Sequence, residues 1–187
     1  AQMPNRDRKI LAKAQSIQLL IQQHQRVVNQ YVDVHQKYET VPVDTRFVYP
    51  VRALMFGLRN ATIPAEWGNW GAQHTVPLTR NGQRQLGVNF NPAGQVNPVG
   101  AANIKYDNQT RVAFTSDLFD KIVPYLSCAR VPRAVGYNVW SYSADLSGNQ
   151  PDGSVNFSRV SQPSITIRHA PEITTATNDS VFNLHII

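Results

Sequence analysis

The sequence predicts an all-β fold of the sandwich or jelly-roll class, preceded by one short helix. Short apolar segments with a period of two recur along the chain, and 12 Pro and 10 Gly are scattered between them as turn residues. Charged residues make up only 16% of the chain, whereas Asn and Gln contribute 15 residues each, so long charged helices are not expected. The helices that would connect parallel strands are missing from the pattern, which excludes a parallel α/β architecture.

The length of 187 residues and the single cysteine set further bounds. A chain of this size buries enough surface for one domain with its own core, without disulfides. One cysteine excludes an intrachain disulfide and any metal site that needs two or four cysteines. No apolar run is long enough to span a membrane, and the first residues do not resemble a signal peptide. The chain opens with Ala1 and ends on an apolar strand-like run, which suggests a segment of a longer protein.

The first elements are a helix and two strands. Residues 6–15 are rich in helix formers, lack Gly and Pro, and follow Asn5 as a possible cap, so they predict a helix. Residues 17–34 contain short apolar groups that end in alternation and predict a strand, although their first part keeps helical spacing. Residues 38–47 alternate less clearly, and Pro42 places them at a sheet edge.

The later strands have stronger patterns. Residues 51–58 are apolar at both parities, which predicts a strand covered on both faces. Beyond residue 100, apolar side chains alternate with polar ones in four short stretches. The side chains expected to face inward are Ile104 and Tyr106, Trp140 and Tyr142, Ile165 and Ile167, and Phe182, Leu184 and Ile186. Seven or eight strands of this kind favour two sheets that close over one core.

A long connection, residues 60–100, interrupts this rhythm. It contains four prolines and several glycines and is far longer than a usual loop. Trp67 and Trp70, together with several aliphatic residues, argue for order, because disordered segments are poor in such residues. We therefore predict a structured projecting loop, with a hairpin at Asn81 and Gly82, and we consider Trp67 and Trp70 its candidate interaction residues.

Residues that carry catalytic chemistry are sparse. The five histidines are scattered, and none of the common nucleophile, phosphate-binding or zinc motifs occurs. Asp117 and Asp120 could form an acid–base pair. Their context instead favours a helix capped by Ser116 or Asp117, with Leu118, Phe119, Ile122 and Val123 packed inward. We predict neither enzymatic activity nor a cofactor or metal.

Four Asn-x-Ser/Thr triplets begin at Asn60, Asn108, Asn156 and Asn178. They are the possible glycosylation sites of the chain. A sequence this rich in Asn, Ser and Thr produces such triplets by chance, and no signal peptide precedes them, so we expect none to be modified.

Three stretches resemble a known family. The first stretch comprises residues 44–47 (DTRF) and 50–60 (PVRALMFGLRN). It is similar to a strand of that family in which LMF is followed by an Asn. Residues 104–111 (IKYDNQTR) are similar to its strand and turn with YENTTR. Residues 136–143 and 150–159 (GYNVWSYS and QPDGSVNFSR) resemble its most specific signature. The family is the double jelly-roll major capsid protein of nucleocytoplasmic large DNA viruses, and the resemblance is closest to the iridovirus-like branch.

The resemblance implies a domain layout. The match is to the second, C-terminal jelly roll, so residues 1–16 become the connecting segment from a preceding roll and residues 17–187 a single eight-stranded antiparallel jelly roll. Residues 60–100 then form the loop between the fourth and fifth strands, in the outer tower of the capsomer.

The resemblance also implies a function: a structural subunit of an icosahedral capsid, assembled as homotrimeric, pseudo-hexagonal capsomers. Expected partners are neighbouring capsomers, minor capsid proteins and the inner viral membrane. The basic residues Arg6, Arg8 and Lys9 would face that membrane. The expected location is the virion, after assembly in the host cytoplasm, and no specific nucleic acid is expected.

Two other functions occur on jelly-roll folds. A carbohydrate- or receptor-binding jelly roll would use Trp67 and Trp70 to grip its ligand. A cupin-like enzyme would need a histidine cluster that the sequence lacks.

Residues 151–154 predict the turn that fixes the register of the strand after it. Pro151 presets φ, Asp152 is expected to bond the backbone two residues on, and Gly153 is expected to tolerate a positive φ.

Overall fold

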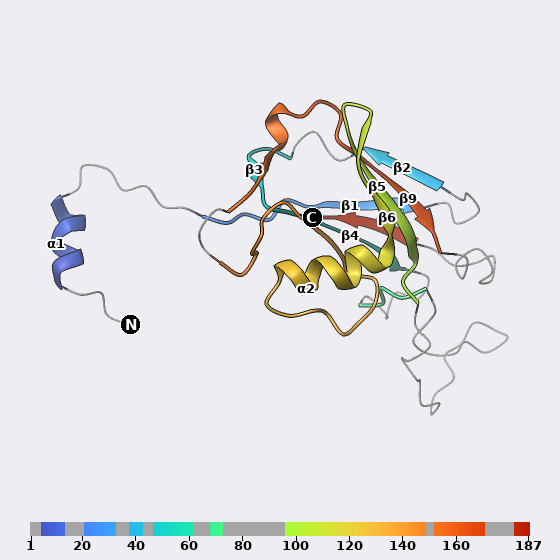
Figure 1. Cartoon of the computed structure of the whole chain (residues 1–187), viewed down its shortest axis with the longest axis horizontal. Helices are drawn as coiled ribbons and strands as arrows, with labels where there is room; N and C mark the ends of the chain where they lie inside the picture. The colour runs from blue at the N-terminus through green and yellow to red at the C-terminus, as the bar shows by residue number, and fades with distance from the viewer. Residues whose placement is uncertain are drawn as a thin grey trace.

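Two four-stranded antiparallel sheets form the body of the protein (Figure 1). The computed structural model describes residues 5–13, 21–32, 38–42, 47–61, 68–72, 96–148, 152–170 and 182–187. The first sheet contains β1 (Val27–Val32), β10 (Phe182–Ile186), β4 (Ala53–Asn60) and β7 (Asn138–Ser141), in that order. The second contains β2 (Tyr38–Pro42), β9 (Ser164–His169), β5 (Val99–Tyr106) and β6 (Gln109–Thr115). This arrangement confirms the predicted eight-stranded jelly roll.

A small third sheet pairs β3 (Pro50–Val51) with β8 (Val155–Asn156). A 3-10 turn, η3 (Phe157–Arg159), follows β8 directly. The third sheet therefore places the residues just before β4 beside the residues that follow the predicted turn at 151–154.

The core lies between the two large sheets. Apolar side chains from β4, β5, β9 and β10 alternate into it, and the period of two in the sequence predicted this for β5, β9 and β10. The largest fully buried side chains from these strands are Leu54, Leu58, Ile104, Ile165, Ile167, Phe182, Leu184 and Ile186. Burial of each such side chain stabilises the fold by roughly 1.5–3 kcal/mol before conformational entropy is counted.

The outer face of β4 differs from the prediction that this strand is covered on both sides. Met55 points away from the core and is 40% exposed. Gly57, on the same outer face, is buried. Within the described part of the chain, the outer face of β4 is therefore only partly covered.

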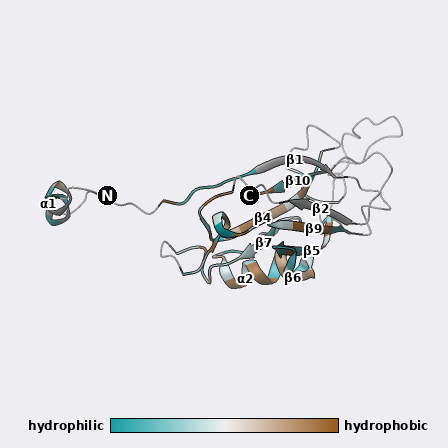
Figure 2. Ribbon diagram, turned by 90° about the horizontal axis from the view of Figure 1, so that it is seen from above, coloured by the Kyte–Doolittle hydropathy of each residue, from teal (hydrophilic) through white to brown (hydrophobic). Residues whose placement is uncertain are grey.

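The N-terminal elements agree in part with the predictions. Helix α1 (Asn5–Lys13) confirms the predicted helix and stands clear of the sandwich in both views (Figures 1 and 2). Within the predicted strand 17–34, residues 27–32 pair with β10, whereas residues 21–26 belong to no helix or strand. Strand β2 lies at a sheet edge, as Pro42 predicted. None of the helices in the described parts of the chain is long and apolar enough to cross a membrane.

The segment after β6 forms a helix with an unexpected first turn. A π-helical turn, η2 (Leu118–Ile122), runs into α2 (Val123–Ser127). A π turn contains more residues than an α turn and so changes which side chains face inward. Phe119 is buried against Phe56 and Trp140, with ring centroids 5.4 Å and 6.2 Å apart. Ile122, predicted to pack inward, is instead 49% exposed.

Asp117, one of the two residues predicted to cap this helix, does not act as a cap. Asp117 occupies the N-cap position, but its backbone is already helical and its side chain makes no cap hydrogen bond. Its carboxylate accepts a hydrogen bond from Lys121 Nζ at 2.7 Å, one turn further on. The aspartate therefore forms a surface ion pair instead of satisfying the first backbone N–H groups.

Candidate functional site: signature network, anchored segment and assembly surface

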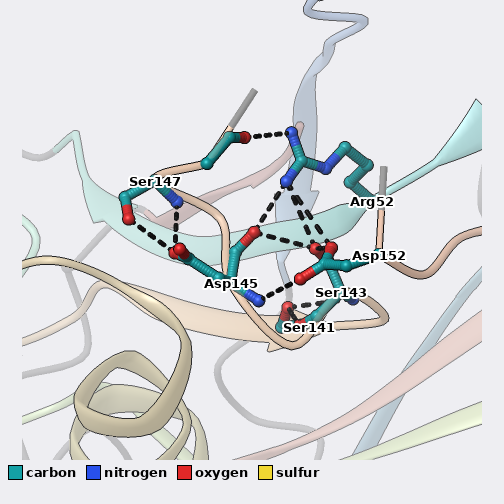
Figure 3. A network of polar contacts seen from close by, with 7 residues as sticks. Arg52, Ser141, Ser143, Asp145, Ser147 and Asp152 are labelled. Carbon is teal, nitrogen blue, oxygen red and sulfur yellow. Dashed lines mark hydrogen bonds and ion pairs between the residues drawn. The ribbon is translucent and has the colours of Figure 1, made fainter. Parts of the chain in front are cut away.

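Arg52, between β3 and β4, is the centre of a polar network (Figure 3). Its guanidinium donates to the carbonyl oxygens of Asp145 at 2.6 Å and Gly148 at 3.0 Å. It also donates to Ser143 Oγ at 3.2 Å and lies 3.7 Å from the Asp152 carboxylate. One side chain therefore fastens the loop after β7 to the start of β4.

Asp152 completes this network from the turn before β8. Its carboxylate accepts hydrogen bonds from the Ser143 hydroxyl and, at 2.6 Å, from the Asp145 backbone N–H. The Ser143 bond and then the Asp145 bond hold the pKa of Asp152 below its ordinary value. The expectation that Asp152 bonds the backbone two residues on is thus corrected, because these carboxylate bonds cross to residues 143–145 instead. Pro151 lies outside the described residues.

Gly153 is required for a different reason than predicted. The φ angle of Gly153 does not lie in the left-handed region. Among the described glycines, only Gly136 has a φ in that region. A Cβ on Gly153 would lie 2.3 Å from the carbonyl oxygen of Tyr142 and 3.2 Å from Cα of Ser143. The glycine permits close backbone approach between the turn and the loop after β7.

Aromatic side chains from the same signature fill one end of the core. Trp140 and Tyr142 pack against the buried cluster, which confirms their predicted inward orientation. The hydroxyls of Tyr142 and Tyr106 form a hydrogen bond between the sheets. The ring of Phe157 makes edge contacts with the rings of Tyr142 and Tyr106, with centroids 6.3 Å and 5.9 Å apart. Burial raises the pKa of Tyr142 and that of Tyr106, so both hydroxyls stay protonated at neutral pH.

The long connection returns to the body at residues 68–72, which we call the anchor segment. The Asn60 N–H donates to the Asn69 carbonyl at 2.9 Å, and the Ala72 N–H donates to the Val96 carbonyl at 2.9 Å. These two bonds close the chain on either side of the anchor segment. The part of residues 60–100 that the structure describes therefore does not project, and the predicted hairpin at Asn81 and Gly82 lies outside the described residues.

Trp70 fixes the anchor segment on the outer face of the first sheet. Its ring contacts His185 on β10 and Tyr137, with centroids 5.1 Å and 5.7 Å away. A Cβ on Gly57 would lie 3.2 Å from the Trp70 ring, and Gly136, at φ 90°, passes against the Trp70 backbone. Trp70 is thus partly buried by contacts within the chain. Trp67 lies outside the described residues.

The glycosylation candidates differ in exposure. Asn60 is buried, and Asn156 is half-buried with its Oδ1 accepting the Ser158 N–H at 3.0 Å. Asn108 is exposed at the tight β5–β6 turn, where its φ is 64°. Asn178 lies outside the described residues. The absence of modification at these triplets stays a prediction.

Asp120, the other half of the possible acid–base pair, points into the protein. Its carboxylate accepts from Asn97 Nδ2 at 3.3 Å, and Asn97 also donates to Asn138 Oδ1 at 2.9 Å. Burial raises the pKa of Asp120. Asp117 is turned to solvent, so the two carboxylates have opposite surroundings. No group of three or more His, Cys, Asp or Glu side chains that could hold a metal is found among the described residues.

An apolar stripe lies on the outer side of the η2–α2 helix. Ile122, Tyr125 and Leu126 recur with the spacing of one helix face and are 49%, 76% and 71% exposed. The opposite side of the helix packs Phe119 and Pro124 into the body. Three large apolar side chains that gather on one exposed face are typical of an interaction surface.

Comparison with known proteins identifies the family. The sequence model described as "Large eukaryotic DNA virus major capsid protein" matches residues 7–185. The major capsid protein of Costelytra zealandica iridescent virus is 33% identical over 138 residues, which are 73% of this chain and 29% of that protein. That of Tipula iridescent virus is 31% identical over 68% of this chain and 26% of its own length. The chain thus spans less than a third of these relatives.

Solved structures show the same fold. The crystal structure of PBCV-1 VP54, fitted into a reconstruction of the virophage Sputnik, matches with a TM-score of 0.63 at 17% identity, over 98% of this chain and 50% of that one. The family match extends over residues 7–185, and it agrees with the eight strands in two sheets that the structure shows. The chain belongs to the major capsid protein family of large eukaryotic DNA viruses.

Proposed function

We propose that this chain is a wall-forming jelly roll of an icosahedral capsid, within subunits that assemble as trimeric, pseudo-hexagonal capsomers. Residues 17–187 form the roll, and residues 1–16 connect it to a preceding roll. Family membership supports the structural role, and the PBCV-1 VP54 chain is about twice the length matched here. The virion is the site of action, with assembly in the host cytoplasm. Minor capsid proteins are additional partners, and no enzymatic step is part of the role.

The apolar stripe is the observation that carries this proposal. Stable protein interfaces have a central patch of buried aromatic and aliphatic side chains, and Tyr is common among the residues that dominate binding. Tyr125 and Leu126 are more than two-thirds exposed and are held on a helix whose other side is locked by Phe119. The occupant that we propose is a neighbouring capsid jelly roll, which removes the stripe from water.

The test is the oligomeric state of the chain with the stripe made polar. We expect light scattering after size-exclusion chromatography to show concentration-dependent oligomers for the wild type. The double variant Tyr125→Ser, Leu126→Ser should shift to monomers with an unchanged melting temperature, because both side chains already face solvent. The matched control Ile21→Ser changes an equally exposed aliphatic residue away from the helix. Assembly of the double variant like the wild type would contradict the proposal.

A second part of the proposal concerns the basic segment at the start of the chain. Arg6, Arg8 and Lys9 are exposed on α1, which stands clear of the sandwich (Figure 1). A positively charged helix of this kind is attracted to anionic lipid, and we propose that it faces the inner viral membrane. Charge reversal of these three residues should abolish cosedimentation of the protein with anionic vesicles. Neither the wild type nor the variant should cosediment with neutral vesicles.

The alternative of a carbohydrate- or receptor-binding module is less well supported. Aromatic residues that grip a sugar present an open ring face, whereas the Trp70 ring is in contact with His185 and Tyr137. The position of Trp70 therefore favours a structural role for this residue.

A further inference from the structure

His185 is a buried residue on the outward-facing side of a strand. It alternates with Leu184 and Ile186, whose side chains enter the core, so its own side chain points to the outer face of the first sheet. It is nevertheless only 2% exposed. The ring of Trp70 lies against it at an interplanar angle of 71°. The covering that removes His185 from water is therefore the anchor segment.

The hydrogen bonding of His185 defines its protonation state. Its Nδ1 lies 2.8 Å from Nη2 of Arg26, on the segment that precedes β1. Because a guanidinium can only donate, Nδ1 is the acceptor and carries no proton. The single proton of the neutral ring is on Nε2, which is buried without a hydrogen-bond partner among the described residues. The observed contact requires a neutral imidazole.

Among the described residues, the charges that act on the pKa of His185 are both positive. Burial is the main cause that lowers its pKa to about 4, and the positive charges of Arg26 and of Arg59 on β4 act in the same direction. The anchor segment contributes the Trp70 ring and no charged side chain, and Tyr137 lies on Trp70. No acidic side chain among the described residues figures among the causes of this shift.

We propose that His185 is an acid-sensitive latch that holds residues 68–72 on the outer face of the first sheet. A proton on Nδ1 turns the acceptor for Arg26 into a second donor and places a positive charge beside two others. The protonated ring gains water only if Trp70 moves away. Release of Trp70 frees the anchor segment and breaks its two backbone hydrogen bonds, with Asn60 and with Val96.

The direction of the pH effect follows from linkage. A histidine whose pKa is lowered in the closed form stabilises that form above its ordinary pKa of 6.5, and this stabilisation is lost as the pH falls toward the lowered value. With about 4 in the closed form and 6.5 in the open form, the open population rises about 20-fold between pH 7 and pH 5. The latch therefore responds in mildly acidic conditions, well above the pH at which the closed ring itself is protonated.

Hydrogen exchange of the complete chain tests the latch. The amides of Asn60 and Ala72 report opening directly, because they make the two bonds that close the anchor segment. After correction for intrinsic exchange rates, we expect their protection to fall about 20-fold from pH 7 to pH 5. Amides of β5 and β9 should keep their protection. The variant His185→Gln retains an acceptor for Arg26 without a titrating ring and should lose the pH response, whereas His24→Gln, an exposed histidine, should keep it.

Protection of Asn60 and Ala72 that is independent of pH in the wild type would overturn the proposal, as would an unchanged response in His185→Gln. If His185→Gln does not fold, the titration of His185 in the wild type decides by its imidazole proton shifts in NMR. A pKa well below 6.5 supports the latch, and a value at or above 6.5 overturns it.

Discussion

The guanidinium of Arg52 lies 3.7 Å from the carboxylate of Asp152, and the pair joins the start of β4 to the turn that precedes β8. Both side chains are partly exposed, so their charge attraction alone contributes little to stability. The value of Arg52 lies in its fixed fork of donors, which also reaches the carbonyl oxygens of Asp145 and Gly148. The loop after β7 has two of its backbone carbonyl groups held by this one residue.

We expect Arg52→Ala to destabilise the protein by about 1–3 kcal/mol, because the two carbonyl groups and Ser143 lose charged hydrogen-bond donors. Arg52→Lys should recover only part of this loss, since an ammonium cannot reproduce the planar fork. Urea unfolding measures the effect. Arg168→Ala, at an exposed position on β9, is the control and should be nearly neutral. Equal stabilities of the two alanine variants would refute the role assigned to Arg52.

Gly153→Ala is expected to lower stability by about 1–3 kcal/mol, and Gly153→Val by more, because the added Cβ meets the Tyr142 carbonyl oxygen. Gly68→Ala is the matched control, since nothing lies within 4 Å of the Cβ added there. Thermal melting distinguishes the two variants. A Gly153→Ala protein that melts like the wild type would show that the close approach is not needed.

Asp120→Asn should stabilise the protein at pH 7. The raised pKa of Asp120 means that the fold favours the protonated carboxyl, so its contribution to stability is present at acidic pH and is lost as the pH rises through the raised value. An amide of the same shape avoids burying this charge. The gain in the urea midpoint over the wild type should therefore narrow as the pH falls toward 4.

The control for this series is Asp117→Asn, which removes a carboxylate that is 69% exposed from a surface ion pair. We expect it to change stability by no more than about 0.5 kcal/mol. A loss of stability in Asp120→Asn at pH 7 would mean that Lys121 and Asn97 favour the ionised carboxylate more than burial opposes it.

The sequence predicts those parts of the fold that follow from strict alternation. The inward faces of β5, β9 and β10 were identified correctly because a strand places every second side chain on one face. The sequence after β6 predicts a helix, and regular α-helical spacing predicts that Ile122 packs inward. The π turn that moves Ile122 outward has no recognisable pattern in the sequence.

Contacts between segments that are far apart in the chain could not be predicted from the sequence. The turn at Asp152 and Gly153 was recognised from its composition, yet the partners of both residues lie in the loop after β7, which only the folded chain brings near. In the same way, Trp70 was recognised as an unusual residue in a long connection. Its seat on Gly57 and against Gly136 depends on three segments that meet only in the fold. His185 is buried because Trp70 packs on it, and no local sequence pattern around His185 indicates this burial.

The backbone bond between Ala72 and Val96 has a practical use. This bond holds the two described ends of the intervening stretch together, and lengthening a stretch between fixed ends costs free energy that grows only with the logarithm of its length. A foreign peptide grafted between these two residues would therefore leave both sheets intact. If the chain tiles a shell, each particle would carry many regularly spaced copies of that graft, which is the arrangement sought in vaccine display.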